Sequence, residues 1–251
     1  MCGRFVLEPT ETEIVETFGL DDVPDTPPRY NIAPTQPILI VRPREVPEGS
    51  NAPPREAVLA RWGLIPPWAK EGDKLPLLIN ARSETAAQKA SFRAAMKRRR
   101  ILVPISGFYE WKRTDVGSRK PLLEPFYVRP RDGRLLALAG LMEVSAGGDE
   151  LVSAAIMTTE ASADFAPIHH RMPVVVEPDD FTRWLDCEGN APQDIADLLR
   201  APEEGFFETV PVSDKVNKVK NQGPELIEPV ERGAVEPTTT KQDEPMQGSL
   251  F

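Results

Sequence analysis

The sequence predicts an α+β fold, in which a single β-rich domain has a curled, barrel-like mixed sheet with peripheral helices. Three observations support this prediction. Short runs of about four to eight apolar or β-branched residues recur along the chain, bounded by glycine, proline, asparagine or aspartate. Few segments show helical spacing of apolar residues, and no segment repeats. The length of 251 residues suits one large domain.

The first elements are a short helix and two strands. Thr10 and Glu13 have the spacing of a capping box, apolar residues follow on one face, and Gly19 favours the end of a helix. Residues 38–41 and 58–64 are predicted strands, because they are apolar and flank a loop rich in proline and glycine.

The later elements are mostly strands. An alanine-rich helix is predicted over 86–98, followed by a strand pair over 101–111 in which Gly107 marks a bend or bulge. Helices are also expected at 178–184 and 192–200. Further strands are expected at 124–128, 134–141, 151–158, 173–177 and 206–212.

The chain divides into a domain over 2–228 and a tail over 229–251. The tail is rich in proline, threonine and acidic residues, so we expect it to be disordered. No apolar run approaches the roughly 20 residues of a membrane span, and the start lacks a signal-peptide pattern. Cys2 and Cys187 give neither a disulfide framework nor metal-ligand spacing. We therefore expect a cytoplasmic monomer that holds no metal.

Charge is distributed unevenly along the chain. The formal net charge of −9 argues against a generic nucleic-acid binder. Residues 82–113, however, contain nine basic and two acidic residues, whereas residues 225–251 contain six acidic and two basic residues. A basic surface that binds a polyanion is therefore compatible with the acidic total.

Cys2 is the first candidate for chemistry. Methionine is usually removed before a small residue, so we expect the mature chain to begin at Cys2. Cys2 would then carry an α-amine and a thiol, with reference pKa values of about 7.7–8.0 and about 8.5. The amine can condense with an aldehyde to an imine, and the thiol can close a thiazolidine ring. Position alone is equally compatible with an incidental residue at a frayed terminus.

Two further candidates are groups that transfer protons. His169 and His170 are the only histidines, and imidazole transfers protons near neutral pH. They lack the neighbouring ligands of a metal site. Glu110 lies between Tyr109 and Trp111 on a predicted strand, a setting that suits a carboxyl group to general acid–base catalysis. The ordinary alternatives are loop histidines at the surface and an outward-facing glutamate.

Asn80, Arg82 and several basic clusters are candidates for binding. An amide can hold a sugar or carbonyl oxygen, and a guanidinium suits phosphate. The basic run 97–100 is also what a solvated helix end contains, although beside aromatic residues such as Trp68 it suits single-stranded nucleic acid. A second basic patch is predicted at Lys215, Lys218 and Lys220.

Several blocks of the sequence carry a resemblance to one protein family. They are Cys2-Gly3-Arg4-Phe5, Arg29-Tyr30-Asn31-Ile32-Ala33-Pro34, Trp62-Gly63-Leu64, Ile79-Asn80-Ala81-Arg82-Ser83-Glu84-Thr85, Gly107-Phe108-Tyr109-Glu110-Trp111, His169-His170-Arg171-Met172-Pro173 and Val219-Lys220-Asn221. In this order they resemble the SRAP family, the SOS response-associated peptidase-like proteins that protect abasic sites in DNA. Relatives often carry aspartate or asparagine at the position of His170, so we match the functional histidine to His169.

The resemblance implies the SRAP fold and a covalent DNA–protein crosslink at abasic sites in single-stranded DNA, formed without a cofactor during the response to DNA damage. The Cys2 amine would attack C1′ of the ring-opened sugar, and its thiol would close the thiazolidine. Asn80 would position the reactants, while Glu110 and His169 would transfer protons. Contacts to DNA are implied for Arg4, Trp68, Arg82, Arg98, Arg99 and Lys220.

Three other functions remain open from the sequence. The family name implies a peptidase, in which the Cys2 thiol attacks an amide with His169 as base, one version being self-removal of Met1. A lyase activity also fits the same residues. The third function is a binding module tethered to a replication sliding clamp, because Gln247, Leu250 and Phe251 match the Gln-x-x-Leu-Phe peptides that dock into bacterial clamps. An arbitrary disordered end would match such a short pattern as well.

Overall fold

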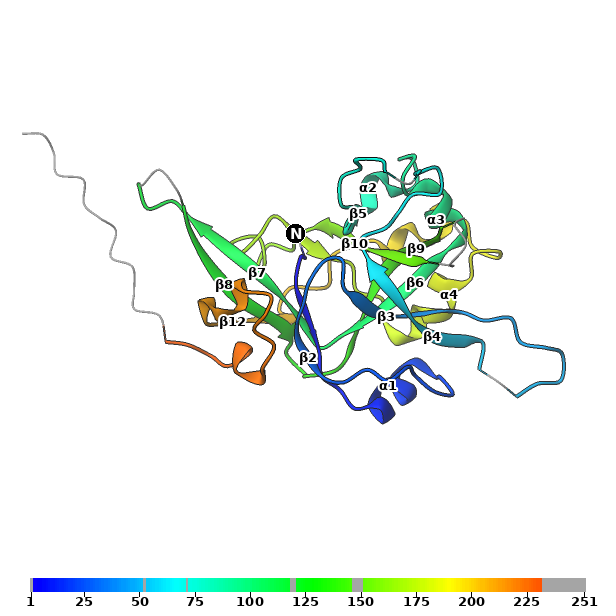
Figure 1. The fold of residues 1–251 in the computed structure, drawn as a ribbon, viewed down its shortest axis with the longest axis horizontal. Helices are drawn as coiled ribbons and strands as arrows, with labels where there is room; N and C mark the ends of the chain where they lie inside the picture. The colour runs from blue at the N-terminus through cyan, green and yellow to red at the C-terminus, as the bar shows by residue number, and fades with distance from the viewer. Residues whose placement is uncertain (1, 52, 71, 118–120, 146–150, 232–251) are drawn as a thin grey trace, which may run out of the picture.

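The computed structural model describes residues 2–51, 53–70, 72–117, 121–145 and 151–231. Two β-sheets lie side by side, with the first strand of the chain near their junction (Figure 1). Among the described residues, no helix is both long and apolar enough to cross a membrane.

The first sheet, sheet A, has five antiparallel strands in the order β12-β8-β7-β1-β2. The buried residues form two core clusters, a larger one that includes Phe5, Trp62 and Phe108, and a smaller one that includes Tyr109, Tyr127 and Val216. The smaller cluster lies on one face of sheet A. The strands of sheet A are β1 (Phe5–Leu7), β2 (Arg29–Ile32), β7 (Gly107–Thr114), β8 (Leu122–Pro130) and β12 (Phe207–Pro211).

The second sheet, sheet B, is mixed and curls on itself. Its strands follow the path β11-β10-β4-β3-β6-β9, and β9 also pairs with β10, which closes a ring of five strands. The β3–β6 and β4–β10 ladders are short, so the ring is partial, and the expected curled, barrel-like mixed sheet is confirmed in this sense. The strands of sheet B are β3 (Pro37–Pro43), β4 (Arg55–Trp62), β5 (Asn80–Arg82), β6 (Arg100–Ile105), β9 (Leu136–Val144), β10 (Val152–Glu160) and β11 (Arg171–Pro173).

Helices are short and lie at the periphery. The first begins at a Thr10 capping box and ends at Gly19, whose φ of 61° is left-handed, as the sequence predicts. The helices are α1 (Glu11–Phe18), α2 (Ser83–Ala86), α3 (Arg93–Arg98) and α4 (Phe181–Leu185), with 3₁₀ turns η1 (Pro178–Asp180), η2 (Pro192–Leu198), η3 (Asp214–Asn217) and η4 (Pro224–Leu226).

The predicted continuous helix over 86–98 is wrong, because the structure divides it into α2 and α3. Ala86 and Phe92 are both buried, but residues six apart lie on different faces of a helix with about 3.6 residues per turn. A break between them lets both side chains reach the core. The predicted strand at 173–177 is misplaced, because β11 covers Arg171–Pro173; beyond it Val174 bonds to both β10 and β9, and Val176 bonds to β9.

The chain crosses between the sheets at Ser106, which separates β6 of sheet B from β7 of sheet A. Its N–H donates to the carbonyl of Val6 over 2.8 Å, and its hydroxyl accepts from the N–H of Glu8. Phe5 of β1 packs against Trp62 of β4 with ring centroids 5.0 Å apart. The larger core cluster therefore joins β1 to sheet B, and the residues that precede Phe5 lie at the junction.

Candidate active site

The strand β7 directs Glu110 toward the larger core. Side chains alternate along a strand, so Glu110 shares a face with Phe108 and is opposite in direction to Tyr109. Phe108 packs against Phe165, with ring centroids 6.0 Å apart, and Phe165 lies in the segment that leads to His169. Glu110 is only 3% exposed. The carboxylate is therefore buried on the side from which the histidine approaches.

Pairing of β1 with β7 brings Cys2 alongside this carboxylate. Phe5 lies opposite Phe108, and the N–H of Tyr109 donates to the carbonyl of Arg4 over 2.9 Å. The residues before Arg4 consequently run beside the next residues of β7. Cys2 is fully buried and holds a free thiol.

The strand β10 holds the other two candidates. It pairs in parallel with β5, where Ile156 lies opposite Asn80, and antiparallel with β11, where Glu160 lies opposite Arg171. Asn80 begins β5, and His169 comes two residues before Arg171. Through these pairings β10 positions Asn80 directly and His169 through the adjoining strand β11.

A direct hydrogen bond joins the two halves of the site. The amide Nδ2 of Asn80 donates to the carbonyl of Cys2 over 2.9 Å. Its Oδ1 is buried and has no hydrogen-bond partner among the described residues. Asn80 therefore links sheet B to the start of the chain and keeps one acceptor directed into the buried region.

The electrostatics of the site couple three of its groups. Burial raises the pKa of the Cys2 thiol well above its usual range, and the negative charge of Glu110 raises it further. Burial lowers the pKa of His169, while the charge of Glu110 opposes this shift. At neutral pH the thiol is protonated and the imidazole is mostly neutral. The charge of Glu110 therefore acts on both groups.

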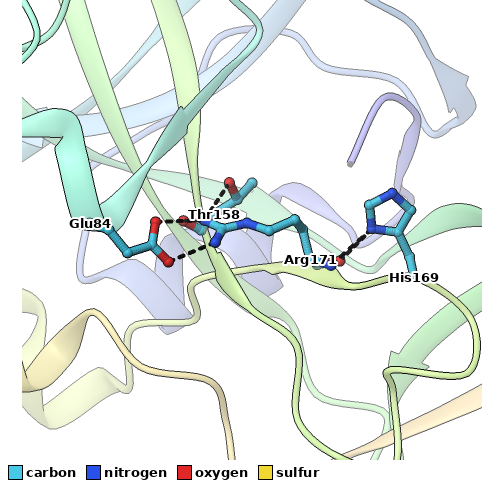
Figure 2. Close-up of polar contacts among 4 residues, drawn as sticks. All are labelled: Glu84, Thr158, His169 and Arg171. Atoms are coloured by element: carbon cyan, nitrogen blue, oxygen red, sulfur yellow. Dashed lines mark hydrogen bonds and ion pairs between the residues drawn. The ribbon is translucent and has the colours of Figure 1, made fainter.

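The ring of His169 is held by the main chain of Arg171. The N–H of Arg171 donates to His169 Nδ1 over 2.9 Å, and the carbonyl of Arg171 lies 3.1 Å from the same nitrogen. Figure 2 shows the Arg171 guanidinium extending the other way, into a bidentate ion pair with Glu84 at 2.6 and 2.9 Å. The sequence blocks contained Arg171 and Glu84, but no pattern indicated that they pair.

Arg4 and Asn31 form a second polar network that the sequence did not reveal. Asn31 is fully buried, and its Nδ2 donates to the carbonyls of Val216, Lys218 and Asn221 at 3.2, 3.3 and 3.0 Å. Arg4 donates to Asn31 Oδ1 over 2.9 Å and to the Val216 carbonyl over 3.0 Å. Arg4 therefore anchors the segment around η3, and its contact to DNA stays a prediction.

Four other residues predicted to bind DNA are exposed, but they lie in different parts of the fold. Trp68, Arg82 and Lys220 are exposed, and Trp68 is 50% exposed, so they are accessible to a ligand. Arg98 is also exposed, but it lines a pocket of about 490 Å³ that also includes Cys187. In Figure 1 its helix α3 lies well to the right of the chain start. The DNA contacts of these residues stay predictions.

Two arginines of the basic run 97–100 have structural partners. Arg99 forms an ion pair of 2.6 Å with Glu143, whose side chain is only 1% exposed. Arg100 is fully buried, and its guanidinium donates to the carbonyls of Trp184, Met96, Asp186 and Asn190. The expectation that the whole run faces phosphates is therefore wrong for Arg100.

The last two predictions concern the end of the chain and metal ligands. Gln247, Leu250 and Phe251 lie outside the described residues. Pro229 and Val230 still bond to the end of β12 and its neighbour, so the expected tail does not begin at 229. Within the described ranges, no cluster of three or more histidine, cysteine or acidic side chains could hold a metal ion.

Comparison with known proteins gives consistent matches. A profile described as "SOS response associated peptidase (SRAP)" matches residues 1–219. Abasic site processing protein YoqW of Bacillus subtilis is 37% identical over 91% of this chain and 99% of its own length. Abasic site processing protein YedK of Escherichia coli is 34% identical over 92% of this chain and 100% of its own. A solved protein from Bacteroides thetaiotaomicron shares the fold, with a TM-score of 0.76 at 21% identity over 92% of this chain and all of its own.

Proposed function

The chain belongs to the SOS response associated peptidase (SRAP) family, and on this premise we propose that it captures abasic sites in single-stranded DNA as a covalent adduct of Cys2. Relatives across most of its length are named abasic site processing proteins, which supports a role in processing DNA lesions. The adduct would shield the lesion until repair.

One observation carries the proposal, namely the convergence of Cys2, Asn80, Glu110 and His169 at the junction of the sheets. Asn80 bonds to the Cys2 carbonyl, and the charge of Glu110 acts on both Cys2 and His169. An aldehyde bound here would meet a nucleophile, an amide that orients it and two groups that transfer protons.

The reaction proceeds through an imine. After removal of Met1, the neutral Cys2 amine attacks C1′ of the ring-opened sugar and forms a C–N bond. Glu110 passes one proton from the nitrogen to the former carbonyl oxygen, which gives a carbinolamine. His169, in its charged form, gives the resulting hydroxyl a second proton, so that one water leaves and a protonated imine remains. The Cys2 sulfur then bonds to C1′ while its proton passes back to His169, which gives the thiazolidine.

Burial of the thiol favours this order of steps over a peptidase reaction. A cysteine peptidase needs a thiolate, but burial holds the pKa of the Cys2 thiol well above its usual range. In the trapping reaction the amine acts first, and the thiol adds to a carbon that is already activated. A blocked α-amine would abolish trapping but would leave a thiol peptidase active.

DNA binding would use the exposed cations and aromatic residues around the junction. Arg82 lies two residues after Asn80 on β5, Lys220 lies in the segment held by Asn31, and Trp68 offers a ring for base stacking. Arg98 and Arg99 would contact only a DNA strand that extends as far as α3. Arg4 would act mainly by holding the binding segment in place.

Intact-mass analysis tests the proposal. The protein is mixed with a single-stranded oligonucleotide that carries one abasic site, and an oligonucleotide without the lesion is the control. We expect a protein lacking Met1 whose mass increases by that of the oligonucleotide minus one water, and no increase for Cys2→Ala. If Met1 is removed and DNA binds but no adduct forms, the proposal is wrong.

We also propose that the last five residues bind a bacterial sliding clamp, since Gln247, Leu250 and Phe251 have the spacing of clamp-binding peptides. Such a tether would raise the local concentration of the protein at replication forks. Deletion of residues 247–251 should abolish capture by immobilised clamp and leave adduct formation in solution unchanged. Unchanged capture would contradict this part of the proposal.

A further inference from the structure

We propose that Glu84 is a positioning residue for His169, which it orients through Arg171 so that Nδ1 is anchored and Nε2 exchanges protons with the substrate. This inference rests on the proposed function for its catalytic meaning. It adds an acidic residue on α2 to a site otherwise built from β1, β5, β7 and the segment before β11.

Contacts with the main chain of Arg171 determine which ring nitrogen of His169 carries a proton. A main-chain N–H can only donate, so the 2.9 Å contact from Arg171 makes His169 Nδ1 an acceptor. The proton of the neutral ring is then on Nε2. When the ring becomes charged, Nδ1–H can donate to the Arg171 carbonyl, 3.1 Å away. The charged ring can then give its Nε2 proton to the substrate and take one back at Nε2 while Nδ1–H stays on the Arg171 carbonyl, so proton exchange is assigned to Nε2.

The main chain of Arg171 is held in place by the contacts of its own side chain. Its guanidinium forms the bidentate pair with Glu84 and also donates to the Thr158 carbonyl over 2.6 Å (Figure 2). The side chain is only 10% exposed, so the fork is held between α2 and β10. A residue fixed at both the side chain and the β11 ladder has little freedom to turn its N–H away from His169.

The ion pair between Glu84 and Arg171 contributes more to the orientation of His169 than to the stability of the fold. Glu84 is 48% exposed, and an ion pair at the surface stabilises a fold only slightly. Its contribution is therefore geometric. His169 lies in a turn-containing segment with no strand or helix of its own, so its orientation depends on its neighbours.

Nuclear magnetic resonance of the free protein tests this link. The chain has only two histidines, so uniformly ¹⁵N-labelled protein gives two sets of imidazole signals, which a His170→Gln variant assigns. We expect a scalar coupling across the hydrogen bond between the Arg171 amide nitrogen and His169 Nδ1. In Glu84→Gln this coupling should disappear, and adduct formation should slow by about 10-fold, less than the roughly 10²–10⁴-fold loss of a general acid or base.

A matched control is available elsewhere in the chain. Glu177 forms a bidentate pair with Arg134 at 2.8 and 3.0 Å, and its side chain is 47% exposed. Glu177→Gln should leave both the coupling and the rate unchanged. Arg171→Lys is a second test should Glu84→Gln unfold, because lysine keeps the charge and the main-chain N–H but cannot span Glu84 and Thr158 together. It should also weaken the coupling and slow the reaction.

Two results would overturn the inference: a coupling retained in Glu84→Gln, or a coupling lost while the rate of adduct formation stays that of the wild type. Failure of the proposed function gives a different result, because the wild-type protein would then form no adduct at all. The coupling is measured without DNA, so it still decides whether Glu84 orients His169.

Discussion

At the scale of single residues, two side-chain amides organise the site. Asn80 connects β5 to the carbonyl of Cys2, and Asn31 connects β2 to the segment that carries Lys218 and Lys220. The sequence identified Asn80 through a family resemblance and gave Asn31 no role. A side-chain amide that collects three carbonyls from a distant segment leaves no local pattern, so only the structure reveals it.

Replacement of Asn31 by alanine should destabilise the fold. It removes the donor to three carbonyls, and an unsatisfied buried polar group costs about 1–3 kcal/mol, so we expect a loss of roughly 2–4 kcal/mol in the free energy of unfolding. Urea denaturation measures this loss. The exposed Asn51 is the matched control, and its alanine variant should unfold like the wild type. Equal midpoints for both variants would refute the assigned role of Asn31.

At the scale of secondary-structure elements, the short apolar runs bounded by turn residues were sufficient to predict most of the strands. The α1 helix was predicted by its capping box and glycine end, and the break near Gly107 was predicted at the right place. The division into α2 and α3 was missed, because burial of Ala86 and Phe92 depends on sheet B, which is distant in sequence. Pairing of β10 with both β5 and β11 was equally invisible, although this pairing builds the site.

The ion pair that links α2 to β10 and β11 should make stability depend on pH. Hydrogen bonds from Arg171 lower the pKa of Glu84 below the ordinary value of a glutamate side chain. A lowered pKa in the folded state gives stability that is complete above about 4.5 and is lost as pH falls through the lowered value. The difference in unfolding free energy between wild type and Glu84→Gln should therefore shrink on acidification from pH 7 toward pH 3. A difference that stays constant, or grows, would contradict this assignment.

At the scale of the whole molecule, the four candidates for catalysis come from four distant segments and meet where the two sheets join. Their sequence numbers carry no information about distance, so composition and periodicity alone could not assemble them. The family resemblance supplied the set, and the structure explains it through the β1–β7 and β5–β10–β11 pairings. The net charge of −9 likewise conceals a surface that exposes the cations Arg82, Arg98 and Lys220.

Salt dependence should reveal that surface. Noncovalent binding of single-stranded DNA is measured with the Cys2→Ala variant, which cannot form the adduct. Each phosphate contact contributes a slope of about −0.7 to log K against log salt, so Lys220→Gln should make the slope shallower by roughly 0.7. Arg42, which pairs with Glu56 on the β3–β4 hairpin, is the control. An unchanged slope for Lys220→Gln would exclude Lys220 from the phosphate contacts.

In the proposed reaction both nucleophiles of Cys2 bond to one aldehyde carbon. The Cys2→Ser variant separates the reaction of the amine from that of the thiol. Serine keeps the α-amine after removal of Met1 but lacks the sulfur that closes a thiazolidine. With abasic single-stranded DNA, we predict a wild-type adduct that survives denaturation without a reductant. The Cys2→Ser adduct should survive only when borohydride has reduced its imine. A Cys2→Ser adduct as stable as that of the wild type without borohydride would contradict the account.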